Sequence, residues 1–110
     1  MRREYPISAI RVNGILIEKV VIDEHVDKHN DHISDGLIVQ IINKLDGKDF
    51  SPASSQDEFE YYMTKVKHDE KWYKLVWLLE NGCFYIGVIT LFRDRRIEWN
   101  IQAKNKLIMF

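Results

Sequence analysis

The sequence contains little cysteine, glycine or proline: one Cys, five Gly and two Pro in 110 residues. The single cysteine, Cys83, excludes an intramolecular disulfide, and with it a disulfide-stapled secreted scaffold. Its apolar neighbours, Phe84, Tyr85 and Ile86, favour a buried, inert thiol over a reactive one. There is no glycine-rich loop before a helix and no G-x-S-x-G motif. Phosphate-loop and serine-nucleophile sites of those kinds are therefore excluded.

Long hydrophobic runs are also missing. No apolar stretch approaches the roughly 20 residues that a membrane-spanning helix needs. The segment Met1–Pro6 has two arginines but no apolar segment after them, which is not typical of a secretory signal. We therefore expect a cytoplasmic protein. Its composition, 45% hydrophobic and 30% charged, fits one globular domain over residues 1–110.

The formal net charge of −1 hides an asymmetry between the two halves of the chain. Residues 1–60 carry 7 Lys/Arg and 12 Asp/Glu, whereas residues 61–110 carry 9 and 5. Such a polarity fits a partner-binding dipole, a weak polyanion-binding surface or an ordinary solvated surface. The overall balance argues against a simple basic module that binds nucleic acid by charge alone.

Strand patterns occur at both ends of the sequence. β-rich runs on both sides of Asn13-Gly14 predict an N-terminal hairpin over residues 7–22. From residue 58 the hydrophobic period is 2, and Asn81-Gly82 is a second hairpin signal. We therefore predict an antiparallel meander over residues 58–102 with three or four strands, the fourth being 97–102. The mostly apolar third strand, 83–92, is typical of a central strand.

The intervening residues 24–46 carry helix signals. Asp23 is a candidate N-cap for a short polar helix, Glu24–Asp31, and Ser34 for an apolar helix that ends at Asp46-Gly47. Hydrophobic residues recur there at helical spacing: Ile33, Leu37, Ile38, Ile41, Ile42 and Leu45. Residues 48–57 have the composition of a surface loop. The order of hairpin, helices and meander predicts an α+β fold.

Three histidines in the polar segment are the first candidates for chemistry. His25, His29 and His32 would share one face of a continuous helix, because their spacings are four and three. Such a face could supply proton transfer near neutral pH. It could also bind a metal, although three ligands from one helix suit a tetrahedral site poorly. The plain alternative is a polar helix with ordinary surface histidines.

Arginines after the third meander strand are the second candidates. Arg93, Arg95 and Arg96 could clamp a phosphate and stabilise charge in a pentacovalent transition state, or could simply end the strand in water. Tyr73 and Lys74, on the neighbouring strand, are candidate auxiliary contacts. Aromatic residues in the meander could stack on a base, although most of them are expected in the core.

Three segments together resemble the BrnT-like branch of the RelE/ParE toxin superfamily: Asp23–Ser34, Leu37–Leu45 and Val88–Arg96. The resemblance implies a compact helix-on-sheet fold, metal-independent RNA cleavage with no cofactor, and a cognate antitoxin that covers the active surface. Members are usually more basic, and their pattern has a shorter N-terminal hairpin. A member that had lost catalysis would keep the fold.

Carried over residue by residue, the resemblance places Lys28 and His29 where that branch has a Lys-His pair. Arg93, Arg95 and Arg96 fall where it has arginines after the last core strand. The implied reaction is attack of a ribose 2′-OH on the adjacent phosphate. In it His25 or His29 would be the acid or base, and Arg93 or Arg96 would stabilise the phosphorane.

The candidate binding residues for RNA phosphate or a partner are Lys28, Tyr73, Lys74 and Arg95. Two other functions remain open on the sequence. One is a non-catalytic interaction module that pairs with a partner of matching polarity. The other is a small metal-dependent enzyme that uses His25, His29 and His32 as ligands.

Overall fold

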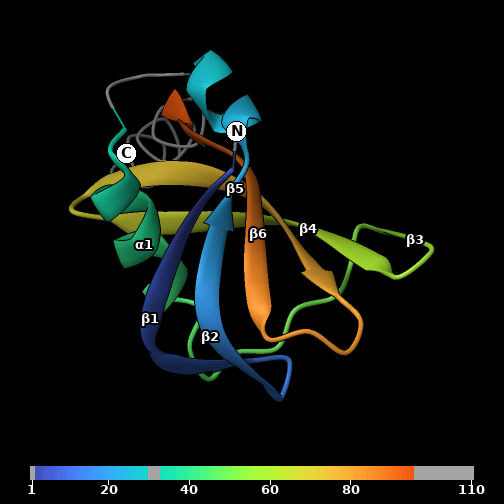
Figure 1. Cartoon of the computed structure of the whole chain (residues 1–110). Coiled ribbons are helices and arrows are strands. Elements are labelled where there is room, and N and C mark those ends of the chain that lie inside the picture. Colours follow the sequence, from blue (N-terminus) through green and yellow to red (C-terminus); the bar gives the residue numbers. More distant parts are fainter. Residues whose placement is uncertain (1, 30–32, 96–110) are drawn as a thin grey trace, which may run out of the picture.

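The computed structural model describes residues 2–29 and 33–95. Its six strands form one sheet in the order β1-β2-β6-β5-β4-β3 (Figure 1). The strands are β1 (Arg3–Val12), β2 (Ile15–Ile22), β3 (Ser54–Gln56), β4 (Phe59–His68), β5 (Lys71–Glu80) and β6 (Tyr85–Arg93). A 3-10 helix, η1 (Glu24–His29), follows β2, and one α-helix, α1 (Asp35–Asn43), comes next.

Two tight turns rest on left-handed backbone conformations. Asn13 and Gly14 have φ of 54° and 73° and connect β1 to β2, and Asp69 and Glu70 have φ of 53° and 64° between β4 and β5. Two successive positive φ values match the right-handed twist of the flanking strands. The expected hairpin at Asn13-Gly14 is thus present, and its first strand begins earlier than expected, at Arg3.

The predicted α+β fold of RelE/ParE type is wrong, because the hairpin and the meander belong to one mixed sheet. β2 pairs with β6 in parallel, with Lys19 opposite Tyr85 and Ile22 opposite Val88. The sheet curls, so that β4 and β5 run across the direction of β1, β2 and β6 (Figure 1). A parallel pairing between segments more than 60 residues apart leaves no local periodicity in a sequence, which is why the hairpin was expected to stand apart.

The helical segment is also smaller than predicted. Residues 24–29 form a 3-10 helix in place of the first turns of a polar α-helix, and α1 covers only Asp35–Asn43. Ser34 is its N-cap as expected, since its hydroxyl accepts a hydrogen bond from the Leu37 backbone N–H at 3.1 Å. Part of the expected loop forms β3, which pairs with β4. The expected strand 97–102 lies outside the described residues.

The core fills one face of the sheet. Ile38, Ile41 and Ile42 of α1 are fully buried against it. Trp77 of β5 stacks on Tyr62 with ring centroids 4.1 Å apart and meets Phe50 edge-on at 5.4 Å. Alternate residues of β5 are buried here: Tyr73, Leu75, Trp77 and Leu79.

The opposite face carries the alternating residues of β4 and β5 that do not enter this core, and we call it the second face. Its members are Phe59, Tyr61, Met63, Lys65 and Lys67 on β4, and Trp72, Lys74, Val76, Leu78 and Glu80 on β5. These residues are half-buried or exposed. Among the described residues no helix has the length and apolar character to cross a membrane.

Candidate functional site

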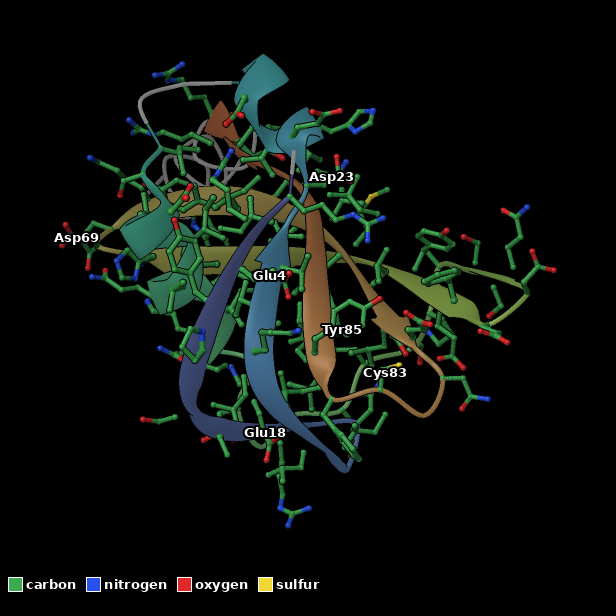
Figure 2. The ribbon with its side chains drawn as sticks, viewed as in Figure 1. Glu4, Glu18, Asp23, Asp69, Cys83 and Tyr85 are labelled. Atoms are coloured by element: carbon green, nitrogen blue, oxygen red, sulfur yellow. The ribbon has the colours of Figure 1, made fainter. Side chains whose placement is uncertain are left out.

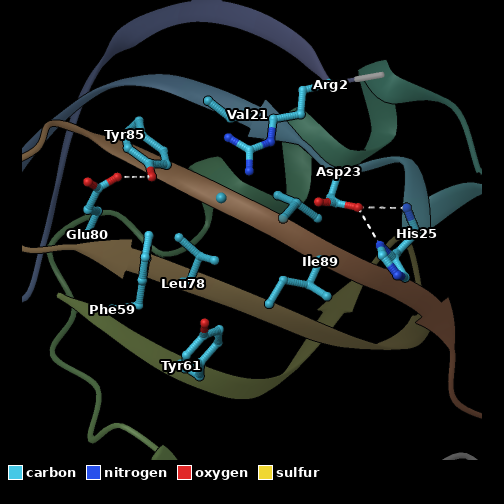
Figure 3. A pocket seen from close by; sticks show the side chains of 12 residues that line it. Arg2, Val21, Asp23, His25, Phe59, Tyr61, Leu78, Glu80, Tyr85 and Ile89 are labelled. Atoms are coloured by element: carbon cyan, nitrogen blue, oxygen red, sulfur yellow. Dashed lines mark hydrogen bonds and ion pairs between the residues drawn. The ribbon is translucent and has the colours of Figure 1, made fainter. Parts of the chain in front are cut away.

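A pocket of about 390 Å³ lies on the second face, where β2 ends and η1 begins (Figure 3). One row of register partners runs across the strands beneath it. Val21 lies opposite Gly87, Gly87 opposite Leu78, and Leu78 opposite Tyr61. The parallel β2–β6 pairing therefore assembles the pocket by joining β2 to the consecutive strands β4, β5 and β6, which are distant from it in sequence.

One position in this row is a glycine, and Leu78 occupies the space that a side chain would need there. A Cβ atom at Gly87 would lie 2.8 Å from Cδ1 of Leu78, closer than real side chains approach. Leu78 instead lies over the bare backbone of Gly87, and Val21 and Ile89 complete an apolar floor. Phe59 and Tyr61 line the same pocket from β4 (Figure 3).

A histidine–aspartate pair stands at one end of the pocket. The Asp23 backbone N–H donates to the Val88 carbonyl at 2.9 Å, which fixes Asp23 at the end of β2. Its Oδ1 accepts the His25 backbone N–H at 2.9 Å and lies 2.6 Å from the His25 Nδ1 (Figure 3). The backbone bond and then the side-chain bond lower the pKa of Asp23 below its ordinary value.

This contact determines which His25 nitrogen is available. A carboxylate can only accept, so the Asp23 side chain favours the form with hydrogen on Nδ1. The Nε2 atom of His25 is then left to exchange protons with a bound molecule. The His25 side chain is 58% exposed, so solvent and ligands can reach it.

Polar groups also line the other end. The Tyr85 hydroxyl donates to Glu80 Oε1 at 2.5 Å, and burial followed by this bond raises the pKa of Tyr85, so the phenol stays protonated. Arg2 reaches over the pocket between Tyr85 and Asp23 (Figure 3). One cation, one carboxylate–imidazole pair and an aromatic wall therefore surround an apolar floor.

Of the predicted catalytic residues, His25 lies in this pocket. Lys28 and His29 belong to η1, but the structure describes only their backbone. His32 and Arg96 lie outside the described residues. The proposed three-histidine metal set therefore falls mostly outside them. Within residues 2–29 and 33–95, no three His, Cys, Asp or Glu side chains gather as metal ligands would.

The other predicted residues are divided between the two faces. Arg93 is the register partner of Tyr73, so both side chains are on the face that carries the core. Lys74 is on the second face, opposite Phe92, and Arg95 is exposed just after β6. The pocket thus brings His25 together with Arg2 and Asp23. Arg93, the register partner of Tyr73, does not line it.

Four residues of the pocket were not predicted from the sequence as parts of a site. Asp23 was recognised only as a helix cap, although the spacing Asp23-x-His25 already allows the side-chain contact. Arg2 reaches the histidine through the β1–β2 hairpin, where Arg3 lies opposite Ile22, and the Glu80–Tyr85 pair reaches it through the β2–β6 pairing.

No protein-family model, curated protein or solved structure matches this chain.

Proposed function

We propose that the pocket is the active site of a metal-independent endoribonuclease. The observation that carries the proposal is the Asp23–His25 pair at the end of a pocket that Arg2 also lines. An oriented imidazole exchanges protons near neutral pH, and a guanidinium pairs with phosphate. The sequence resemblance to RNA-cleaving toxins suggested the same chemistry, but on Lys28, His29 and the arginines at and just after the end of β6, and the fold that it implied is wrong.

In this reaction His25 Nε2 takes the proton from a ribose 2′-OH. The O2′–P bond forms and the P–O5′ bond breaks, and protonated His25, directly or through a water, returns the proton to the departing O5′. The products are a 2′,3′-cyclic phosphate and a 5′-hydroxyl. Arg2 stabilises the negative charge of the phosphorane, and the apolar floor and aromatic wall hold a base.

The first prediction concerns His25. A positioned acid–base group contributes about 10²–10⁴ in rate, so His25→Ala should reduce cleavage of a fluorescent single-stranded RNA by that order. His68→Gln is the matched control. His68 lies on β4 outside the pocket, so this variant should cleave RNA at the wild-type rate. Chelator should leave the wild-type rate unchanged, and a 2′-deoxy residue at the cut site should abolish cleavage.

Equal rates for wild type and His25→Ala would remove the assignment.

In the cell, the same proposal puts the protein in the cytoplasm with a cognate antitoxin that covers the pocket. Expression should then arrest growth, and the product of an adjacent gene should relieve the arrest. A harmless protein with no nuclease activity would favour the non-catalytic interaction module.

A further inference from the structure

We propose that the second face beyond the pocket binds single-stranded RNA, with Lys65 and Lys74 holding its phosphates. The proposal rests on the endoribonuclease function and identifies how its substrate would be held. It also explains why two lysines lie side by side on the sheet outside the pocket.

That feature is a pair of like charges on neighbouring strands. Lys65 of β4 and Lys74 of β5 are direct register partners, so their side chains leave the sheet side by side. Like charges in this arrangement destabilise a sheet. In the part of the chain that the structure describes, neither ammonium forms an ion pair. By contrast, Lys19 is neutralised by Glu4 at 2.7 Å.

Among the β4 and β5 members of this part of the face, the charge is one-sided. Lys67 follows Lys65 on the same face, and its nearest carboxylate is Glu70, at 3.5 Å and 91% exposed. The one acidic member of the second face, Glu80, accepts the Tyr85 hydroxyl at the pocket end. An anion bound between Lys65 and Lys74 would relieve their repulsion.

The lysines and the pocket lie along one line. Tyr61 lines the pocket, Met63 comes next on the same face, and Lys65 follows. At about 3.3 Å per residue, Tyr61 and Lys65 are roughly 13 Å apart along β4. Met63 between them is 57% exposed, an apolar contact of the kind a base covers.

This combination of an aromatic wall, an exposed apolar side chain and unpaired lysines suits a single strand. Splayed bases stack on aromatic faces while a basic track follows the backbone. Paired bases are not available for such stacking, so duplex RNA should bind less tightly. Figure 2 labels Tyr85 on β6 and Asp23 after β2, two residues of the pocket that this part of the face adjoins.

The test measures binding in the His25→Ala background by anisotropy of a labelled single-stranded RNA. Lys65→Ala/Lys74→Ala should weaken binding at least tenfold and should lower the slope of log K against log salt by about 1.4, for two phosphates. The control pair Lys48→Ala/Lys71→Ala removes the same charge from exposed positions outside the second face. It should change affinity less than twofold.

A charge reversal separates binding from folding. Lys65→Glu would face Lys74 as an opposite charge, so the melting temperature should stay the same or rise while RNA binding is lost. Equal losses in the two double variants, or full binding by Lys65→Glu, would overturn the proposal. So would equal affinity for duplex RNA or for anionic vesicles. RNA binding by the wild-type protein without any cleavage would contradict only the nuclease function.

Discussion

At the scale of single residues, Arg3 is the side chain with the most polar contacts on the described surface. It makes two hydrogen bonds to Asp35, at 2.8 and 3.1 Å, and two to Asp27, at 3.0 and 3.1 Å. Tyr5 adds a hydroxyl hydrogen bond to Asp35. These contacts connect β1 to η1 and α1, the two elements on either side of residues 30–32. They thereby hold the segment that carries His25.

We expect Arg3→Lys to lower the free energy of unfolding by about 1–2 kcal/mol, measured by urea denaturation. An ammonium cannot reproduce two bidentate pairs, although partial exposure (33% for Arg3, 25% for Asp35) limits the loss. The control is Lys19→Met at the more exposed Glu4 pair, where the loss should stay below about 1 kcal/mol. Equal losses would show that Arg3 acts as an ordinary surface charge.

At acid pH, the free energy of unfolding should depend on the same contacts of Asp35. Burial raises the pKa of Asp35, but the hydrogen bonds from Arg3 and Tyr5 outweigh it and the net pKa is lowered. The folded state therefore holds fewer protons than the unfolded one. Its extra stability is present above the ordinary Asp pKa and is lost as pH falls through the lowered value. This part of the pH dependence should be weaker in Arg3→Lys.

At the scale of elements, the Asn13-Gly14 turn is connected to the far strands of the sheet. Asn13 Nδ2 donates to the Tyr62 hydroxyl at 2.9 Å, and Asn13 Oδ1 accepts the Phe50 backbone N–H at 2.5 Å. Burial, followed by the hydrogen bond to Glu60, raises the pKa of Tyr62 to about 12, so its hydroxyl stays protonated. The turn thus braces the aromatic cluster around Trp77.

Asn13→Gly should therefore cost about 1–3 kcal/mol of unfolding free energy. Glycine keeps the positive φ that the turn requires, so the loss reports the two side-chain hydrogen bonds and the groups they leave unpaired. Asn81→Gly in the other Asn-Gly pair is the control. Asn81 is exposed, its φ is not positive and its side chain makes no hydrogen bond to the described residues, so this change should cost only the backbone entropy of glycine, about 0.5–1 kcal/mol. Similar losses at both sites would refute the bracing role.

The elements also show how far local sequence can lead. The Asn13-Gly14 turn, the Ser34 cap and the alternation of β4 and β5 depend on neighbours in the chain, and the sequence predicted each of them. The 3-10 geometry of Glu24–His29 and the short β3 depend on tertiary contacts, and both were missed. Histidine spacing was interpreted with α-helical geometry that η1 does not have.

At the scale of the whole molecule, the same limit applies to the site. His25 could be selected from its own chemistry, but Leu78 and Tyr85 could not, because they reach it only through the β2–β6 pairing. Arg93 was selected for its place at a strand end. Its face depends on the register with Tyr73 and on an irregularity at Val76/Trp77, and no local pattern in the sequence predicted either.

If one sheet unites the two halves, they should unfold together. β6 lies between β2 and β5, and Val20, Ile22, Ile86 and Val88 are fully buried. In native-state hydrogen exchange, we expect amides of β2, β5 and β6 to share the slowest rate, set by global unfolding, while exposed β3 exchanges by local opening. Ile86→Ala should then lower the protection of all three strands equally, by about 2–5 kcal/mol. Faster exchange confined to β1 and β2 would instead mean that the hairpin opens as a separate unit, and the pocket with it.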